Sequence, residues 1–504
     1  MSVNKKLDLP IYNKLKEIRD SRVVSFHMPG HKYGRIYDEL GYSHIMRELY
    51  LLDTTEIIGT DNLHNPKGII KKSQDNIKDI VFPNIDCEIR ILVNGSTCGI
   101  EAAIMSSLKE GDEIIVNRAC HQSTYNGILL AKAKPIYVKD YIDEENNIIL
   151  GAREEDYIEA IENNTKAKAI FITRPTYHGM VFEIENLVKK AHENNMIVIV
   201  DEAHGAHFGL NEKFPTSAVL LGADIVIQSC HKTLPSFTQS SIMIVNNKNE
   251  NLDLSRLNQM LNMTESSSPS YIMMMGVEIC YDIYKKYGRV KTLKLLDDIN
   301  RFKKSIKGYE IFETSDPTKI FINTIKNGIN GYDFAKVLRY RYNIQVELSN
   351  YCGILMLCSI ANDENDFEEM ITALNEIRNK KLFGLNMDFF DDIEDANKKK
   401  INDNIKKVKS SRNIDFKIPY NIPKMKYKPH IAIDMETELI SIEESIGRSS
   451  GDFVIPYPPG VCILSPGEII TEEIISYLKK AIEGNVDING IDNIGEKMIR
   501  VIVE

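Results

Sequence analysis

The chain has 504 residues, 43% of them hydrophobic, and a formal net charge of −10. This length allows two or three domains, and no apolar run is long enough to cross a bilayer. The acidic charge argues against a nucleic-acid partner and mildly favours a cationic small substrate. Eight cysteines lie scattered without a CxxC pair, which indicates neither a disulfide framework nor a structural zinc site. Because the N-terminus lacks the apolar stretch of a signal peptide, we expect a cytoplasmic protein.

The N-terminal part combines one helical pattern with turn-rich segments. Apolar spacing predicts a helix over residues 4–22. Pro29-Gly30 then predicts a turn between His27 and His31. We reject a metal site on this histidine pair, because Pro-Gly would break the helix that the four-residue spacing needs. The polar loop 53–66 lacks low-complexity bias, which favours a functional loop.

From about residue 68, strand and helix patterns alternate. Short β-branched runs predict strands at residues 89–93, 113–117, 135–138, 168–173, 197–200, 224–228 and 241–246. Helical patterns lie between them, beginning with residues 69–80 and with a helix that runs to residue 108. This alternation is typical of an α/β domain with a mostly parallel sheet, whose ligand binds at the carboxyl ends of the strands.

Polar residues follow two of these runs, where buried parallel strands would deliver side chains to one site. Asp201 follows the strand at 197–200, and Lys232 comes shortly after the strand at 224–228. Pyridoxal 5'-phosphate (PLP) needs two such groups: an amine that forms a Schiff base, and a carboxylate that keeps the pyridine nitrogen protonated. An aspartate at a strand end is also a common helix cap, and most lysines are solvated, so the pair alone leaves both interpretations open.

Other polar segments lie at the same edge of the predicted sheet. Asn94-Gly-Ser-Thr-Cys-Gly99 stands between a strand and a helix, where N–H groups and hydroxyls make a phosphate site, although such residues also serve as caps. His121 follows the strand at 113–117; its imidazole is either stacked on a flat cofactor or an ordinary hydrogen-bonded residue. The strand at 168–173 likewise ends in a polar segment.

A second unit begins near residue 295. Helices 331–341 and 364–378, with short strands near 343–348 and 353–359, predict a smaller α+β domain. Residues 385–413 are rich in charge, Asn and Lys, which predicts a solvated helix and linker rather than a nucleic-acid patch.

The end of the chain holds another ordered segment. Prolines and glycines in residues 447–468 leave little room for a helix, and an amphipathic helix follows over 471–483. The predicted organisation is therefore an N-terminal arm or linker (1–67), a large domain (68–294), a small α+β domain (295–384) and a C-terminal domain with the charged linker (385–504).

Several strings, taken together and in order along nearly the whole chain, resemble one family. They are His27-Met-Pro-Gly-His-Lys32, Asp61-Asn-Leu-His64, Asn94-Gly-Ser-Thr97, Asp201-Glu-Ala-His-Gly-Ala-His-Phe208, Ser229-Cys-His-Lys-Thr-Leu-Pro-Ser-Phe-Thr-Gln239 and Pro456-Tyr-Pro-Pro-Gly460. This set resembles the PLP-dependent ornithine/lysine/arginine decarboxylases of the aspartate-aminotransferase fold. The resemblance implies a fold-type-I PLP enzyme, with a large mostly parallel-sheet domain and smaller α+β C-terminal domains.

The resemblance also implies roles for individual residues. Lys232 would form the Schiff base, and Asp201 would pair with the pyridinium nitrogen. His121 would stack on the ring, Ala203 would pack against it, and His204 would lie close to the cofactor. The implied phosphate contacts are Ser96, Thr97, Ser229 and His231.

The same resemblance implies an active site built across a homodimer. The Ser266–Ser268 turn looks like the element that reaches a partner subunit's phosphate, and the N-terminal arm would contribute to the interface. Larger family members carry an N-terminal receiver-like domain. Here the first predicted helix starts within ten residues of the N-terminus, so we expect a short form that assembles as a homodimer or dimer-based oligomer.

The implied reaction is decarboxylation of a basic amino acid, with arginine expected first, lysine second and ornithine third. Either Lys232 or His231 would protonate Cα after carbon dioxide leaves. A substrate guanidinium would bind best to a bidentate carboxylate, whereas an ammonium would bind best to a single negative charge with further hydrogen-bond acceptors. Candidates for that acid are Glu56, Asp61, Glu347 and Glu468.

Four alternatives to this interpretation can be weighed against the same residues. An aminotransferase or β-eliminating lyase would share the fold but normally needs an arginine clamp for the α-carboxylate. A non-catalytic PLP-binding regulatory protein is disfavoured by the presence of both Lys232 and Asp201. Asp201-Glu-Ala-His204 also spells a helicase box, but the sequence contains no Gly-Lys dipeptide for a phosphate loop. As metal ligands, His204 and His207 lack a third ligand at a useful spacing.

Overall fold

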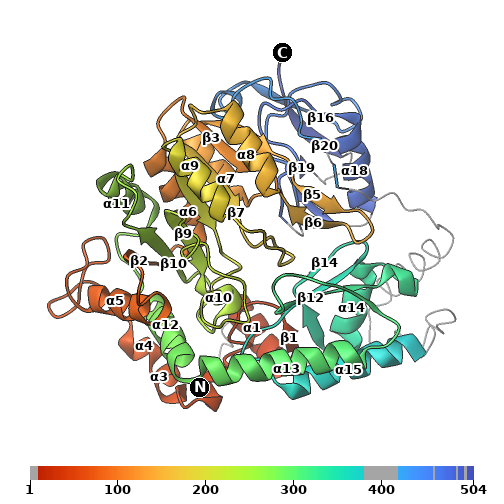
Figure 1. Cartoon of the computed structure of the whole chain (residues 1–504). Helices are drawn as coiled ribbons and strands as arrows, with labels where there is room; N and C mark the ends of the chain where they lie inside the picture. Colours follow the sequence, from red (N-terminus) through yellow and green to blue (C-terminus); the bar gives the residue numbers. More distant parts are fainter. Residues whose placement is uncertain (1–8, 380–417, 420, 458–459, 484–485, 493–496) are drawn as a thin grey trace, which may run out of the picture.

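A seven-stranded sheet forms the centre of the computed structural model (Figure 1), which describes residues 9–379, 418–419, 421–457, 460–483, 486–492 and 497–504. The strand order is β2-β10-β9-β8-β7-β3-β4. These strands are β2 (Cys87–Leu92), β3 (Glu113–Asn117), β4 (Lys134–Val138), β7 (Ala169–Thr173), β8 (Ile197–Asp201), β9 (Ile225–Ser229) and β10 (Ser241–Asn246). Within this sheet β10 is antiparallel to both of its neighbours, and the pairs from β9 to β4 are parallel.

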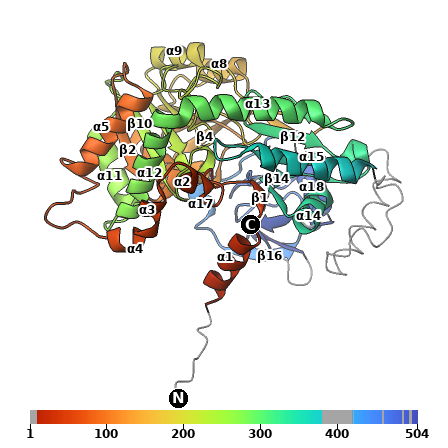
Figure 2. The same ribbon diagram turned by 90° about the horizontal axis from the view of Figure 1, so that it is seen from below.

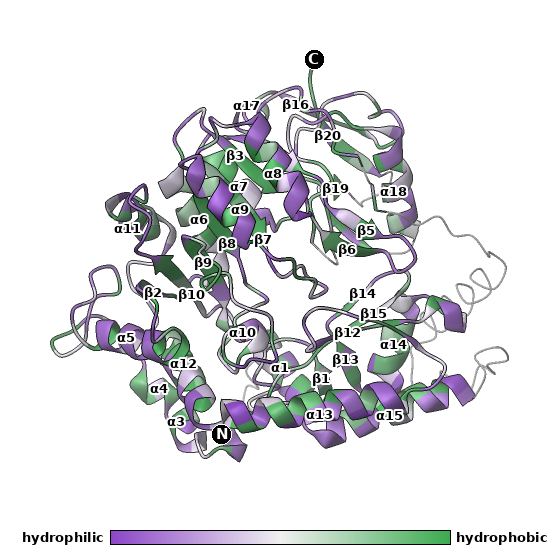
Figure 3. Cartoon of the chain, in the orientation of Figure 1, coloured by the Kyte–Doolittle hydropathy of each residue, from purple (hydrophilic) through white to green (hydrophobic). Residues whose placement is uncertain are grey.

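Helices cover both faces of the sheet. Alternate residues of one strand point to opposite faces, so Ile170 and Ile172 join one core while Ala169 and Phe171 join the other. The first core includes residues of α5 (Ile69–Val81), α8 (Glu154–Asn163), α9 (Glu185–Glu193) and α12 (Tyr271–Ile283). The second includes residues of α6 (Gly95–Ser107), α7 (Gln122–Leu130) and α11 (Leu254–Thr264). Burial on both faces explains why these strands are nearly continuous apolar runs, green in Figure 3.

A smaller antiparallel sheet follows in the chain. Its order is β11 (Glu310–Phe312), β12 (Lys319–Asn323), β15 (Gly353–Leu357) and β14 (Leu348–Ser349). It shares a core with α13 (Arg289–Ser305), α14 (Gly331–Arg341) and α15 (Glu364–Asn379). A π-helical turn (Tyr284–Gly288) joins α12 to α13. Because α13 runs through the division predicted between residues 294 and 295, one helix links the two units, and the domain division stays a prediction.

The N-terminal segment contacts elements near both sheets. α1 (Pro10–Asp20) buries none of its residues and stands away from the body (Figure 2). β1 (Val24–Phe26) then pairs in parallel with β13 (Ile344–Val346). The turn at Gly30 follows; a Cβ there would lie 2.3 Å from the carbonyl oxygen of Leu234, and the Gly30 N–H donates to the carbonyl of His231 at 2.7 Å. This turn is therefore pressed against the loop that carries Lys232.

Three short helices follow the Gly30 turn: α2 (Arg35–Glu39), α3 (Ser43–Arg47) and α4 (Leu49–Leu52).

The C-terminal part folds as two small sheets. One is β16 (Thr437–Ser441), β20 (Met498–Ile502) and β19 (Ile491–Asp492); the other is β17 (Ile455–Tyr457) and β18 (Asp487–Asn489). α17 (Pro429–Ala432) and α18 (Glu472–Glu483) complete it. It contacts the hairpin of β5 (Tyr141–Asp143) and β6 (Ile148–Gly151), where the Ile418 N–H donates to Asn147 Oδ1 at 3.3 Å.

The predicted α/β class with a mostly parallel sheet is confirmed, and each strand predicted for the large domain is present with ends shifted by at most two residues. The helix predicted over 4–22 is α1, with residues 4–8 outside the described residues, as is the charged stretch 385–413. The strand predicted over 353–359 ends at Leu357. β1, β5, β6, β11 and β12 had no counterpart in the prediction. None of the helices in the described ranges is long and apolar enough to cross a membrane.

Candidate active site

The carboxyl edge of the central sheet lines a cavity of about 470 Å³, a size typical of small-molecule sites. Parallel strands bring their carboxyl ends to one edge, so segments far apart in sequence meet there. The predicted site residues that line this cavity are Ser96, Thr97, His121, Asp201, Ala203, His204, Ser229, His231 and Lys232.

Ser266 does not lie with the other predicted site residues. It is exposed and outside the cavity, and its carbonyl oxygen contacts His64 Nε2 at 3.1 Å. Its predicted reach toward the phosphate of a partner subunit concerns a second chain and stays a prediction.

Asp201 and Lys232 face the same cavity from neighbouring strands. Asp201 is the last residue of β8 and is buried; its Oδ1 accepts the Ala203 N–H at 2.9 Å, which orients the carboxylate. Lys232 lies in α10 (Cys230–Thr233), the short helical turn that follows β9. Burial lowers the pKa of the Lys232 amine, against the opposing effect of the Asp201 and Glu347 carboxylates.

A cluster of hydroxyls lies at the start of α6. Ser96 Oγ is 2.5 Å from Ser229 Oγ and 3.0 Å from Ser241 Oγ. Nearby in the cavity wall, Thr173 Oγ1 is buried without a hydrogen-bond partner among the described residues. Hydroxyls and the N–H groups of a helix N-terminus are the donors that a phosphate needs. With the His121 ring, Asp201 and Lys232 on the same walls, this donor set fits a PLP molecule.

His121 and His231 are both neutral imidazoles held by local contacts. His121 caps α7, where its Nδ1 accepts the Ser123 N–H at 3.2 Å, and burial lowers its pKa. His231 Nδ1 contacts the Ser240 carbonyl oxygen at 3.1 Å, so Nδ1 carries the proton and Nε2 has the lone pair. Burial lowers the pKa of His231 to about 4.

The prediction missed two residues beside His204. Lys319, the first residue of β12, is buried, and its Nζ lies 2.9 Å from His204 Nδ1 and donates to the Tyr177 carbonyl at 2.5 Å. The Tyr177 ring lines the cavity, with its centroid 4.6 Å from that of His204. A lysine just before an apolar run looks like an ordinary solvated strand end, so the sequence held no strong signal for Lys319.

Glu347 is the candidate acid that binds two residues of the cavity lining from behind. Its Oε1 accepts the Tyr177 hydroxyl at 2.6 Å, and its Oε2 accepts the Met28 N–H at 2.9 Å; Tyr177 and Met28 both line the cavity. The Glu347 side chain is 2% exposed, and His27 Nδ1 lies 3.2 Å from Oε2.

The other three candidate acids bind residues that do not line this cavity. Asp61 accepts backbone N–H groups at the start of α5, from Gly68 at 2.7 Å and Ile70 at 3.1 Å. Glu56 bonds to its neighbours in the N-terminal loop. Glu468 forms a two-point ion pair with Arg118 at 2.7 and 2.8 Å, with its side chain fully buried. Each of these acids therefore binds a structural partner away from the cavity lining.

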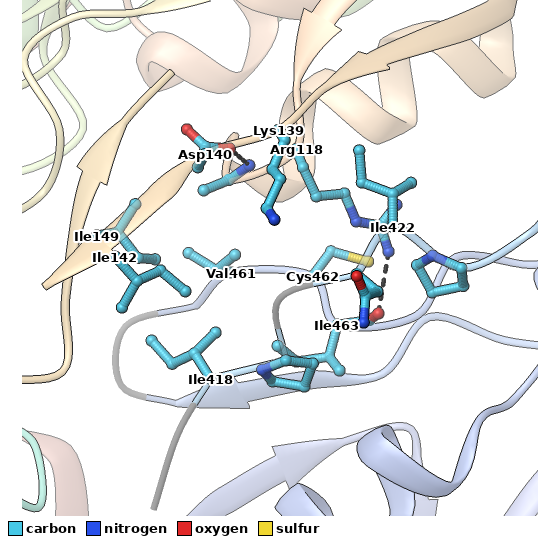
Figure 4. Close-up of a pocket in the computed structure, with 14 residues that line it drawn as sticks. Arg118, Lys139, Asp140, Ile142, Ile149, Ile418, Ile422, Val461, Cys462 and Ile463 are labelled. Atoms are coloured by element: carbon cyan, nitrogen blue, oxygen red, sulfur yellow. Dashed lines mark hydrogen bonds between the residues drawn. The ribbon is translucent and has the colours of Figure 1, made fainter. Parts of the chain in front are cut away.

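Arg118 also lines a second, smaller cavity between the large sheet and the C-terminal segment (Figure 4). This cavity measures about 50 Å³ and shares Ala119 and Val461 with the larger one. Arg118 donates to the Ile463 carbonyl at 3.0 Å there. The Arg118 contacts with Glu468 and Ile463 thus hold the C-terminal segment beside the larger cavity.

His204 and His207 have different hydrogen-bond partners. His207 Nε2 lies 3.1 Å from Asp316 Oδ1, both buried, whereas His204 contacts the two lysines. Within the described ranges, no group of three His, Cys, Asp or Glu side chains is placed to hold a metal ion.

Comparison with known proteins matches two parts of the chain to one family. The model described as "Orn/Lys/Arg decarboxylase, major domain" matches residues 9–320, and "Orn/Lys/Arg decarboxylase, C-terminal domain" matches residues 416–494. The arginine decarboxylase of Bacillus subtilis (strain 168) is 32% identical over 511 residues, covering 99% of this chain and 98% of the relative. That of Bacillus anthracis is 31% identical over 510 residues, with 99% and 98% covered.

Solved structures show the same fold. The lysine decarboxylase LdcF of Francisella novicida has a TM-score of 0.76 at 20% identity, covering 98% of this chain and 81% of that one. The constitutive lysine decarboxylase of Escherichia coli has a TM-score of 0.76 at 19% identity, covering 98% and 82%.

Proposed function

Since this chain belongs to the Orn/Lys/Arg decarboxylase family, we propose that it removes the α-carboxyl group of arginine, with lysine as second choice and ornithine as third. Decarboxylation of a basic amino acid follows from the family and from full-length relatives named arginine decarboxylase. The observation that carries the proposal is the placement of Lys232 and Asp201 on the walls of one cavity.

PLP is the cofactor that the family implies, and the donors of the cavity fit it. Lys232 would attach it covalently, Asp201 would keep its ring nitrogen protonated, and His121 would stack on the ring. Ser96, Thr97 and Ser229, with His231 nearby, would bind its phosphate; Ala203 would pack on the ring beside His204. When bound, PLP supplies the electron sink for the carbon–carbon bond that breaks.

The residue that returns a proton to Cα is proposed to be Lys232. His231 uses its Nδ1–H on the Ser240 carbonyl, and burial lowers its pKa to about 4. Its Nε2 is therefore an acceptor at neutral pH and has no proton to give. The Lys232 amine lines the cavity and holds exchangeable protons in either charge state.

The cavity also suits loss of a carboxylate better than its retention. No arginine stands among the described residues that line it. An α-carboxylate placed there would meet no guanidinium clamp from these residues, so we expect its charge to be less stabilised in the ground state than in a site with an arginine. This favours decarboxylation over the aminotransferase alternative.

Incubation of the purified chain with equal arginine, lysine and ornithine tests the proposal. We expect carbon dioxide and agmatine as the main products, identified by mass. A keto acid would contradict decarboxylation and favour an aminotransferase, whereas no turnover of any of the three would favour a binding protein.

Glu347 is the acid we propose for the substrate's guanidinium. In the same assay Glu347→Gln should lower kcat/KM for arginine about 10- to 100-fold, because a charged hydrogen bond contributes about 1.5 to 3 kcal/mol. Gln retains a carbonyl that accepts from Tyr177 or Met28, so the fold should persist. Glu468→Gln is the control for loss of a buried glutamate; it should lower the Tm, and its effect on kcat/KM should be smaller than that of Glu347→Gln. An unchanged kcat/KM in Glu347→Gln would exclude this role.

We also propose that this chain forms a homodimer and that it works in the cytoplasm. Large apolar side chains are exposed on the N-terminal arm, with Tyr50 79%, Leu51 68% and Ile57 60% exposed, which is typical of a surface covered by another subunit. Ser266 lies outside its own cavity, as expected of a residue that serves a partner. The mass of the protein in solution by light scattering tests this assembly.

A further inference from the structure

His204 stands between two amines, one on each ring nitrogen. Lys232 Nζ lies 3.2 Å from Nε2, on the side of the cavity. Lys319 Nζ lies 2.9 Å from Nδ1, on the far side of the ring. His204 is 7% exposed and Lys319 is 1% exposed. These three side chains therefore form one hydrogen-bonded row, which runs from the buried Lys319 through His204 to the proposed cofactor lysine at the cavity.

A neutral imidazole has one N–H donor and one lone pair. Burial first, and then the charges of Lys232 and Lys319, hold the pKa of His204 well below its usual value, so the ring is neutral. If Lys319 donates to Nδ1, then Nε2 carries the proton and donates to a neutral Lys232. If Lys232 donates to Nε2, then Nδ1 carries the proton and donates to a neutral Lys319. Both contacts cannot be satisfied when both lysines are charged.

We propose that Lys319 is a positioning residue for Lys232: the two amines share protons across His204, so a charged Lys319 leaves the Lys232 amine neutral and nucleophilic. The transfer is balanced. One N–H bond breaks at Lys232 Nζ as one forms at His204 Nε2, and one breaks at Nδ1 as one forms at Lys319 Nζ. The need for a neutral Lys232 amine rests on the proposed function, whereas its coupling to Lys319 does not.

Charged groups surround both amines of the row. Asp316, itself paired with His207, and Glu347 both act to raise the pKa of Lys319. Burial, the largest effect, and the charge of Lys232 lower that pKa to about 7. Asp201 and Glu347 likewise act to raise the pKa of Lys232, against the larger effect of burial. The neighbouring His178 is neutral, because burial and then the Lys319 charge lower its pKa to about 3.

Trace acetylation of the full chain after removal of bound cofactor tests this coupling. The labelling of Lys232 is followed against pH by peptide mass spectrometry. In Lys319→Met we expect the Lys232 midpoint to rise by about one pH unit, which is about a tenfold loss of neutral amine at neutral pH. In Lys319→Arg the midpoint should stay low, because a guanidinium remains charged and donates to Nδ1.

His204→Phe separates sharing through the ring from repulsion through space. In that background the difference between Lys319→Met and Lys319→Arg should fall by half or more, as a double-mutant cycle measures. Lys32→Met is the matched control: Lys32 is also buried but donates to the carbonyls of His27 and Leu357 at 2.7 and 2.9 Å. It should leave the Lys232 midpoint unchanged.

Equal Lys232 midpoints in Lys319→Met and Lys319→Arg would overturn the proposal, as would a difference that survives His204→Phe intact. Should Lys319→Met not fold, nitrogen-15 shifts of His204 in Lys319→Arg decide, since the proposal requires the proton on Nε2 and a proton on Nδ1 would overturn it. None of these measurements uses turnover. A chain with coupled lysines but no decarboxylation would contradict the proposed function alone.

Discussion

Lys232→Ala is expected to lower decarboxylation of arginine by about 10⁴-fold or more, a loss of the size seen when a covalent catalytic group is removed. Lys232 is the amine that lines the same cavity as Asp201, and the proposed function requires it both to attach the cofactor and to return a proton to Cα. Alanine can do neither. Carbon dioxide released from labelled arginine measures the loss.

The covalent link gives this prediction a second readout. After borohydride reduction of the purified protein, the peptide that contains Lys232 should carry the mass of the cofactor, and the Lys232→Ala protein should carry none. Lys32→Met provides the control, because it removes a different buried lysine that donates to two carbonyl groups. Cofactor mass found on any other lysine would show that the site is assigned to the wrong residue.

The strands of the large domain could be predicted because they are buried on both faces. Val198 and Val200 join one core and Ile197 and Ile199 the other, so β8 is apolar at every position before Asp201. The polar residue after such a run marks the carboxyl edge. This is why Asp201, Lys232 and His121 could be placed at one edge from sequence alone.

Contacts between distant segments could not be predicted in the same way. Lys319 reaches His204 across 115 positions of sequence, and Met28 reaches Glu347 across 319. The hydrophobic pattern of a short sequence segment does not indicate which distant residues will pair. Among the four candidate acids, only the folded chain separates Glu347, which binds Tyr177 of the cavity wall, from Glu468, which binds Arg118. Buried polar partners are visible in sequence as residue types, but their pairing depends on how the sheets meet.

Asp201→Asn is expected to lower kcat for arginine about 100- to 1000-fold, the usual cost of losing one electrostatic group that acts on the reacting centre. The amide keeps an oxygen that can accept the Ala203 N–H, a contact of 2.9 Å in the native chain. The turn after β8 should therefore persist, and the loss reports the missing charge. Steady-state kinetics should show the change in kcat more than in KM.

The charge of Asp201 also has a predicted effect on Lys232 that needs no turnover. Its carboxylate acts to raise the pKa of the Lys232 amine, against the larger effect of burial. Replacement by Asn removes that stabilisation of the charged form, so the acetylation midpoint of Lys232 should fall, opposite in sign to the effect of Lys319→Met. Asp201→Glu, which retains the charge, should shift the midpoint less and recover part of kcat. Full activity in Asp201→Asn would mean that the carboxylate does not act on the ring nitrogen. It would contradict the role proposed for Asp201 in keeping that nitrogen protonated.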